Sequence, residues 1–91
     1  MKRVPVFLTV TAQQLLRHLH PDLKRLLRRA LDELASHPMK GKLLQEELAG
    51  LWSLRVSHYR VIYQMDEASI TVIFLGPRRT VYERLREVLL K

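Results

Sequence analysis

A stripe of apolar residues in the first half of the chain constrains the fold more than any other feature. Its members recur at the three- and four-residue spacing of one face of an α-helix. They are Leu23, Leu26, Leu27, Ala30, Leu31 and Leu34. Pro21 suits the first turn of this helix, and Ser36-His37-Pro38 predicts its end. The helix must bury the stripe against other elements of the chain.

A strand and a shorter helix are predicted before this helix. Residues 4–10 are mostly β-branched and apolar, and Pro5 indicates a strand start or a sheet edge. Thr11-Ala12-Gln13-Gln14 has the form of a capping box, which predicts a helix from Ala12 to about Leu19. The two helices together predict a helical hairpin.

The second half of the chain has the two-residue alternation of a β-sheet. Residues 51–56, 59–65 and 69–75 predict a three-stranded antiparallel meander, preceded by a polar connector over residues 39–49 with a short helical turn near residues 44–48. Gly76-Pro77 ends the last strand, and Val81, Leu85, Val88 and Leu89 share one face of a C-terminal helix.

These elements predict one two-layer α+β domain over residues 1–91, in the order β-α-α-β-β-β-α. We expect a small, mostly antiparallel sheet with the helices packed on one face. No apolar run reaches the roughly 18 to 20 residues that cross a bilayer, so we expect a cytoplasmic protein without a membrane partner. Cysteine is absent and the four histidines lack metal-binding spacing, so we expect no metal or other cofactor.

The charge balance indicates an anionic partner. The chain has 16 Lys and Arg against 9 Asp and Glu, a net charge of +7, and 11 of the cations are arginine. The planar guanidinium group suits bidentate phosphate contacts, so a polyanion or an acidic protein is the expected partner. Arginine enrichment and the absence of asparagine are equally typical of a heat-adapted composition.

Strand alternation predicts a polar sheet face with a cluster of cations. Ser53 and Arg55 point to the side opposite Trp52, and Arg60 lies beside Arg55 across the hairpin. Adjacent guanidinium groups repel, which suggests an anion site. Arg78 follows the next strand, and Tyr82 is predicted one helical turn further on. Taken singly, such residues are more often ordinary surface positions than functional ones.

The segment from Gly50 to Tyr63, G-L-W-S-L-R-V-S-H-Y-R-V-I-Y, resembles the RelE/ParE toxin superfamily. Residues 38–43 and 48–50 are similar to the connector of this family, and Gly76-Pro77-Arg78 with Val81-Tyr82 is similar to its closing motif. The resemblance covers nearly the full chain. Members of the RelE branch cut messenger RNA in the ribosomal A site, whereas ParE-type members poison DNA gyrase and cut nothing.

For a RelE-like protein the resemblance implies three catalytic residues. Arg60 and Arg78 match arginines that hold the scissile phosphate, and Tyr82 matches a tyrosine associated with proton transfer from the attacking 2′-hydroxyl. A phenol is mostly protonated at neutral pH, so Tyr82 can act as a base only where neighbouring arginines favour the phenolate.

The predicted substrate-binding set is Arg55, Lys42 and Ser53, of which Arg55 matches a basic position on the second strand of the family fold. RelE enzymes often have two lysines on the second strand of the family fold, where this chain has Leu51 and Ser53, and we expect Lys42 to supply some of the missing charge. Other members have a histidine where this chain has Pro77.

The resulting hypothesis is a toxin of a type II toxin–antitoxin pair. It would be a ribosome-dependent, metal-independent endoribonuclease whose partners are ribosome-bound messenger RNA, ribosomal RNA and a small acidic antitoxin. The missing lysines favour an alternative, a ParE-like gyrase inhibitor or a degenerate toxin that only binds its antitoxin. An independent RNA-binding module is a weaker reading, because the sheet lacks the exposed aromatic pairs that stack on bases.

Overall fold

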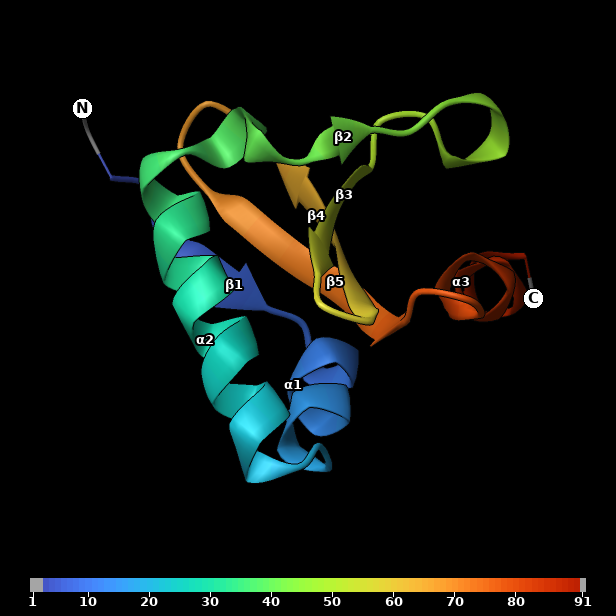
Figure 1. Cartoon of the computed structure of the whole chain (residues 1–91). Helices are drawn as coiled ribbons and strands as arrows, with labels where there is room; N and C mark the ends of the chain where they lie inside the picture. The colour runs from blue at the N-terminus through green and yellow to red at the C-terminus, as the bar shows by residue number, and fades with distance from the viewer. Residues whose placement is uncertain (1–2, 91) are drawn as a thin grey trace.

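The computed structural model describes residues 3–90 and contains a five-stranded mixed sheet with three α-helices (Figure 1). The elements in chain order are β1 (Val6–Leu8), α1 (Val10–Arg17), α2 (Pro21–Ser36), η1 (Pro38–Lys40), β2 (Lys42–Leu43), η2 (Glu46–Leu48), β3 (Trp52–Val56), β4 (Tyr59–Met65), β5 (Ile70–Pro77) and α3 (Val81–Leu89). The strand order is β1-β5-β4-β3-β2. Only the β1–β5 pair is parallel among these strands. The predicted α+β class and the mostly antiparallel sheet are confirmed.

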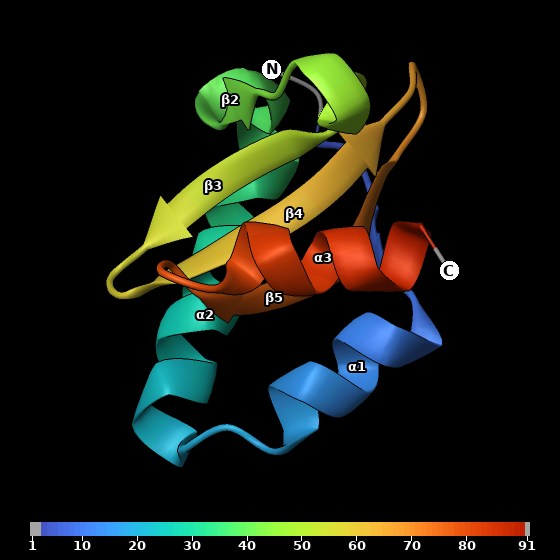
Figure 2. The same ribbon diagram turned by 90° about the vertical axis from the view of Figure 1, so that its right-hand side faces the viewer.

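The helices cover both faces of the sheet, which corrects the expectation that they share one face. One core lies under α1 and α2, where Leu27, Leu31 and Leu34 pack with Val61 and Tyr63. A second core lies under α3 and includes Leu48, Leu51, Ile62, Phe74, Val81 and Leu85. Figure 2 shows α3 in front of the sheet and α2 behind it. The alternation of β4 explains this arrangement, because its apolar residues point to both sides.

The first helix begins earlier than its sequence pattern predicts. The N-cap of α1 is Thr9, whose Oγ1 accepts a hydrogen bond from the Ala12 N–H at 3.1 Å. The predicted capping box at Thr11 is therefore wrong, and β1 is limited to three residues. By contrast, α2 begins at Pro21 and ends at Ser36, as predicted.

Tyr63 attaches the connector to the sheet. Its side chain is fully buried, and its hydroxyl donates to the Pro38 carbonyl oxygen at 2.9 Å and accepts from the Gly41 N–H at 3.1 Å. Burial raises the pKa of the Tyr63 phenol, and the Gly41 hydrogen bond opposes this rise. A Cβ on Gly41 would lie 2.4 Å from the Tyr63 hydroxyl oxygen, so only glycine fits there. These contacts place β2 against β3.

The C-terminal helix is attached to the sheet mainly through its first half. Val81 and Leu85 are buried against Ile62 and Phe74, and Arg86 forms an ion pair with Glu47 of η2. The last apolar residues, Val88, Leu89 and Leu90, are exposed. Within residues 3–90, no helix combines the length and the apolar character needed to cross a membrane.

We expect Tyr63→Phe to lower the free energy of unfolding by about 1 to 3 kcal/mol, because it leaves two part-buried backbone groups without their partner. Gly41→Ala should also destabilise the protein, since its methyl group would overlap the Tyr63 hydroxyl. Urea unfolding of both variants beside Tyr59→Phe, a half-buried tyrosine on the same strand, measures the effect. Equal unfolding midpoints for Tyr63→Phe and Tyr59→Phe would contradict it.

Candidate functional site

The register of the sheet gathers the polar side chains on one face. Arg55 of β3 lies directly opposite Arg60 of β4, as the alternation predicts. Ser53 pairs with Lys42 of β2 on one side and with Ile62 of β4 on the other. Directly opposed residues share a face, and so do residues two apart on one strand. Lys42, Ser53, Arg55 and Arg60 therefore belong to the face that α3 covers.

Ser53 joins β4 to α3 at the centre of this face. Its Oγ accepts a hydrogen bond from Arg60 Nη1 at 3.2 Å and another from the Tyr82 hydroxyl at 3.0 Å. The Arg60 guanidinium carbon lies 5.9 Å from the centre of the Tyr82 ring, within cation–π range. We call Ser53, Arg60 and Tyr82 the hydroxyl–arginine cluster.

The burial of Ser53 departs from the sequence-based expectation. The residue lies on the predicted face but is only 2% exposed, while Arg60 and Tyr82 are half-buried. The difference arises because α3 packs on this face and brings the Tyr82 hydroxyl to Ser53. Ser53 therefore has almost no exposed surface for the substrate binding predicted for it. Arg60 and Tyr82, for which catalysis was predicted, remain partly accessible.

The other predicted site residues lie at the margin of the hydroxyl–arginine cluster. Lys42 and Arg55 are exposed, and Arg55 Nε lies 3.5 Å from the Ser57 carbonyl oxygen. Arg78 is exposed, and its backbone N–H donates to the His58 carbonyl oxygen at 2.7 Å, which ties it to the β3–β4 turn. The prediction that Arg78 and Tyr82 are one helical turn apart is wrong, because α3 begins at Val81.

The cations around the cluster form no ion pair with a carboxylate of residues 3–90. Among residues 3–90, each ion pair joins residues outside the cluster: four involve an acidic residue of α2, and the fifth joins Arg86 of α3 to Glu47 of η2. Arg55 and Arg60 face each other across the β3–β4 pair without a carboxylate partner in that part of the chain. Such an arrangement repels itself and attracts an anion.

The geometry combines a guanidinium group, a phenol and a buried hydroxyl beside exposed cations. Arginine side chains can stabilise negative charge on a phosphoryl group, and a phenol can transfer a proton. The sequence predicted Arg55, Arg60 and Tyr82 as site residues, but it did not predict that Ser53 hydrogen-bonds to both Arg60 and Tyr82. The only signal for that link was a hydroxyl residue at a position where the family resemblance had suggested lysine.

Comparison with known proteins gives consistent matches across most of the chain. Residues 6–82 match the family described as the ParE toxin of the type II toxin–antitoxin system parDE. Toxin RelG of Mycobacterium tuberculosis is 36% identical over 80 residues, which cover 84% of this chain and 92% of that protein.

Two solved structures show that the similarity includes the three-dimensional fold. The RelBE2 toxin–antitoxin complex of M. tuberculosis contains a chain that is 30% identical, with a TM-score of 0.76 over 84% of this chain and 99% of that one. The archaeal RelE–RelB complex of Pyrococcus horikoshii gives 26% identity and a TM-score of 0.69, over 86% of this chain and 97% of that one.

We expect Arg55→Gln to raise the free energy of unfolding by up to about 1 kcal/mol at low salt, because it removes the repulsion with Arg60. At about 1 M salt the difference should shrink, since the Debye length falls to about 3 Å. Urea unfolding at both salt concentrations, with Arg28→Gln on the exposed face of α2 as the control, measures it. A loss of stability in Arg55→Gln at low salt would show that Arg55 has an attractive partner instead.

Proposed function

The chain belongs to the RelE/ParE superfamily and is a RelE-family toxin of a type II toxin–antitoxin system, and on that premise we propose that it is a ribosome-dependent endoribonuclease. It cuts messenger RNA in the ribosomal A site and so stops translation. The observation that carries the proposal is the hydroxyl–arginine cluster, which holds Arg60 and Tyr82 together beside Arg55.

The arginines supply charge stabilisation at the scissile phosphate. As the 2′-oxygen attacks, negative charge accumulates on the non-bridging oxygens of the phosphorane. Arg60 is held in place by Ser53 and the Tyr82 ring, so it needs little reorganisation to meet that charge. Arg55 and Arg78 add positive potential from the exposed margin. Removal of one such donor in other enzymes costs about 3 to 4 kcal/mol of transition-state stabilisation.

Tyr82 is the group placed to handle the proton. In its phenolate form it takes the proton of the 2′-hydroxyl while the 2′-oxygen forms a bond to phosphorus. The bond from phosphorus to the 5′-oxygen then breaks, and that oxygen takes up a proton from a water molecule. The hydroxide that remains takes the proton from Tyr82, which restores both the water and the phenolate. The products are a 2′,3′-cyclic phosphate and a 5′-hydroxyl end. No metal ion takes part in this sequence.

The ribosome provides the positioning that this small domain lacks. Arg55, Arg78 and Lys42 are exposed around the cluster and so do not enclose an RNA strand. Holding reactants in the correct geometry can lower a barrier by about 7 to 11 kcal/mol. Messenger RNA held in the A site arrives already oriented, so free RNA should be a poor substrate.

A second candidate function is inhibition of DNA gyrase without catalysis, because the matching family is described as the ParE toxin. Such a protein needs a binding surface but has no catalytic use for a phenol held beside an arginine. The hydroxyl–arginine cluster therefore favours the nuclease. Induction of the gene in cells separates the two, since a nuclease halts translation first and a gyrase inhibitor alters DNA supercoiling first.

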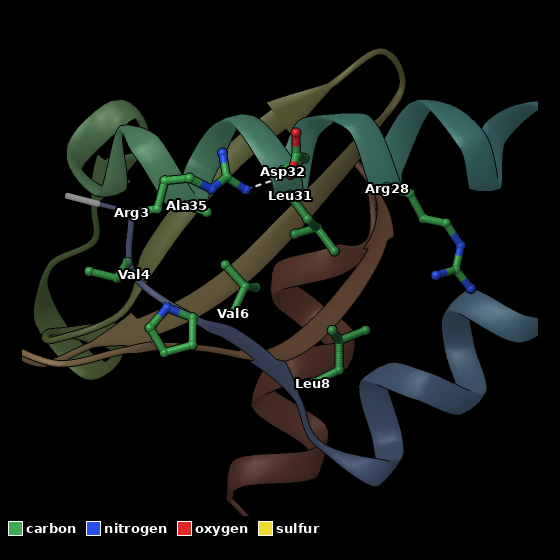
Figure 3. A pocket seen from close by; sticks show the side chains of 9 residues that line it. Arg3, Val4, Val6, Leu8, Arg28, Leu31, Asp32 and Ala35 are labelled. Atoms are coloured by element: carbon green, nitrogen blue, oxygen red, sulfur yellow. Dashed lines mark hydrogen bonds and ion pairs between the residues drawn. The ribbon is translucent and has the colours of Figure 1, made fainter. Parts of the chain in front are cut away.

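We further propose that an acidic, amphipathic segment of the antitoxin binds the groove between β1 and α2. Two related chains, those of the M. tuberculosis RelBE2 and P. horikoshii RelE–RelB structures, were solved as complexes with antitoxins. The groove has a volume of about 420 Å³, and Val6, Leu8, Leu31 and Ala35 form its apolar floor (Figure 3). β1 is an edge strand of the sheet, so its outer backbone groups are open to a partner strand.

Charge complementarity specifies the occupant of this groove. Arg3 is paired with Asp32 at 2.6 Å, whereas Arg28 projects at the other end of the groove without an ion-pair partner among residues 3–90. Arg17 and Lys24 line the adjoining surface next to Arg28. An acidic partner with apolar residues matches both the floor and the rim better than a nucleic acid does, because RNA has no side chains for the apolar floor.

For the nuclease, purified protein should cleave messenger RNA on programmed ribosomes and leave the same RNA nearly intact in their absence. Arg60→Ala and Tyr82→Phe should each slow cleavage by about 100-fold or more, because each removes a group that acts on the reacting atoms. Arg78→Ala should slow it less, since the Arg78 side chain lies at the margin. Primer extension maps the cut at nucleotide resolution. Equal cleavage of free and ribosome-bound RNA would rule out the ribosome-dependent mechanism.

For the antitoxin, Arg28→Glu should weaken binding roughly tenfold, or about 1.4 kcal/mol, because it places negative charge on the rim of the groove. Arg29→Glu is the matched control, since it makes the same change at the next residue of α2 but does not line the groove. Binding is measured by calorimetry with the antitoxin encoded by the neighbouring gene. Equal losses in the two variants would show that only overall charge matters.

A further inference from the structure

We propose that Ser53 is a positioning residue for the cleavage reaction, whose hydroxyl sets Arg60 and Tyr82 in one catalytic arrangement. This inference rests on the proposed nuclease function. Ser53 is the only side chain among residues 3–90 that hydrogen-bonds to both of these groups. Arg60 comes from β4 and Tyr82 from α3, so the hydrogen bonds to the Ser53 hydroxyl connect the sheet to the helix.

The chemistry of a hydroxyl suits this role in both protonation states of Tyr82. A hydroxyl oxygen has two lone pairs and one proton, so it can accept from the phenol and from Arg60 together. When Tyr82 is a phenolate, the Ser53 hydroxyl can rotate and donate to it while still accepting from Arg60. A lysine at this position can only donate, and an alanine can do neither.

The burial of Ser53 restricts it to this indirect role. At 2% exposure its side chain does not reach a substrate, although it lies among groups that do. Its backbone is held between β2 and β4, where it pairs with Lys42 and Ile62. The hydroxyl is therefore presented from a rigid strand, and Arg60 and Tyr82 take their positions from it.

This assignment predicts which kinetic constant changes. Removal of the Ser53 hydroxyl leaves the exposed cations Arg55, Arg78 and Lys42 in place, so ribosome binding should be retained. The half-buried Arg60 and Tyr82 lose their shared partner, so the rate of the bound complex should fall. A hydrogen bond to a charged group accounts for a change of about 10- to 100-fold in such a rate.

The test uses single-turnover cleavage of messenger RNA on programmed ribosomes with the full-length protein. Ser53→Ala should cut about 10- to 100-fold more slowly at saturating ribosomes, with the half-saturating ribosome concentration unchanged. Ser53→Thr, which keeps the hydroxyl, should retain most of the wild-type rate. Thr71→Ala removes a hydroxyl from β5 of the same sheet, away from the cluster, and should match wild type. Thermal unfolding of each variant verifies that the domain is folded.

A double-mutant cycle with Tyr82→Phe distinguishes positioning from general structural damage. If Ser53 acts through the phenol, Ser53→Ala should slow the Tyr82→Phe protein much less than it slows wild type. Strict additivity of the two rate losses would overturn the inference, and so would a wild-type rate for Ser53→Ala. A folded Ser53→Thr protein as slow as Ser53→Ala would also count against it.

The same experiment separates this inference from the proposed function. If the wild-type protein does not cleave ribosome-bound RNA, the nuclease proposal fails and the role of Ser53 in it fails with it. If the wild type cleaves and Tyr82→Phe does not, while Ser53→Ala cleaves normally, the nuclease stands and only the positioning role is lost.

Discussion

The burial of β4 on both faces is the constraint on which the rest of the structure depends. Val61, Ile62 and Tyr63 are each at most 1% exposed, although consecutive residues of a strand point to opposite sides. One side is covered by α2, and the other side needs a second cover, which α3 provides. The docking of α3 on Ile62 and Phe74 is what brings Tyr82 to Ser53 and Arg60.

Apolar packing and polar chemistry are therefore linked in this domain. Val81 and Leu85 hold α3 on the sheet by burial, and Tyr82 lies between them on the same helix. The Tyr82 side chain is half-buried, so its hydroxyl needs a hydrogen-bond partner, and the Ser53 hydroxyl is that partner. The cations around this contact lie on the margin, where water screens their mutual repulsion when no anion is bound.

The proposed antitoxin groove and the proposed catalytic cluster lie on opposite faces of the sheet. The groove opens on the side of α2, and the cluster lies under α3. An antitoxin segment in the groove alone leaves the hydroxyl–arginine cluster uncovered. Under the two proposals, such an antitoxin would neutralise the toxin by its added bulk, which would prevent entry into the A site, or by a second segment that reaches the other face. The two proposals thus predict separable effects of mutations in β1–α2 and in β3–β4.

Local patterns were sufficient to predict most elements. The leucine stripe predicted α2 with its observed bounds, and strand alternation placed Arg55 beside Arg60, because both depend on residues close in the chain or across one hairpin. The predicted start of α1 was wrong because Thr9 and Thr11 are chemically equivalent as N-caps. The hydrogen bond of Thr9 to β5 decides between them. The short strand β2 was also missed, because its position depends on the contact of Gly41 with Tyr63, 22 residues away.

By itself the sequence determined the class of the fold, the family resemblance and the identity of the cations on one sheet face. These follow from periodicity and residue type, which act over one or two turns of helix or across one hairpin. Only the tertiary structure decided that α3 packs opposite α2, that Ser53 is buried, and that Arg60 and Tyr82 share its hydroxyl. Residues 29 positions apart meet at that oxygen, and no local pattern encodes a contact that depends on how a whole helix docks.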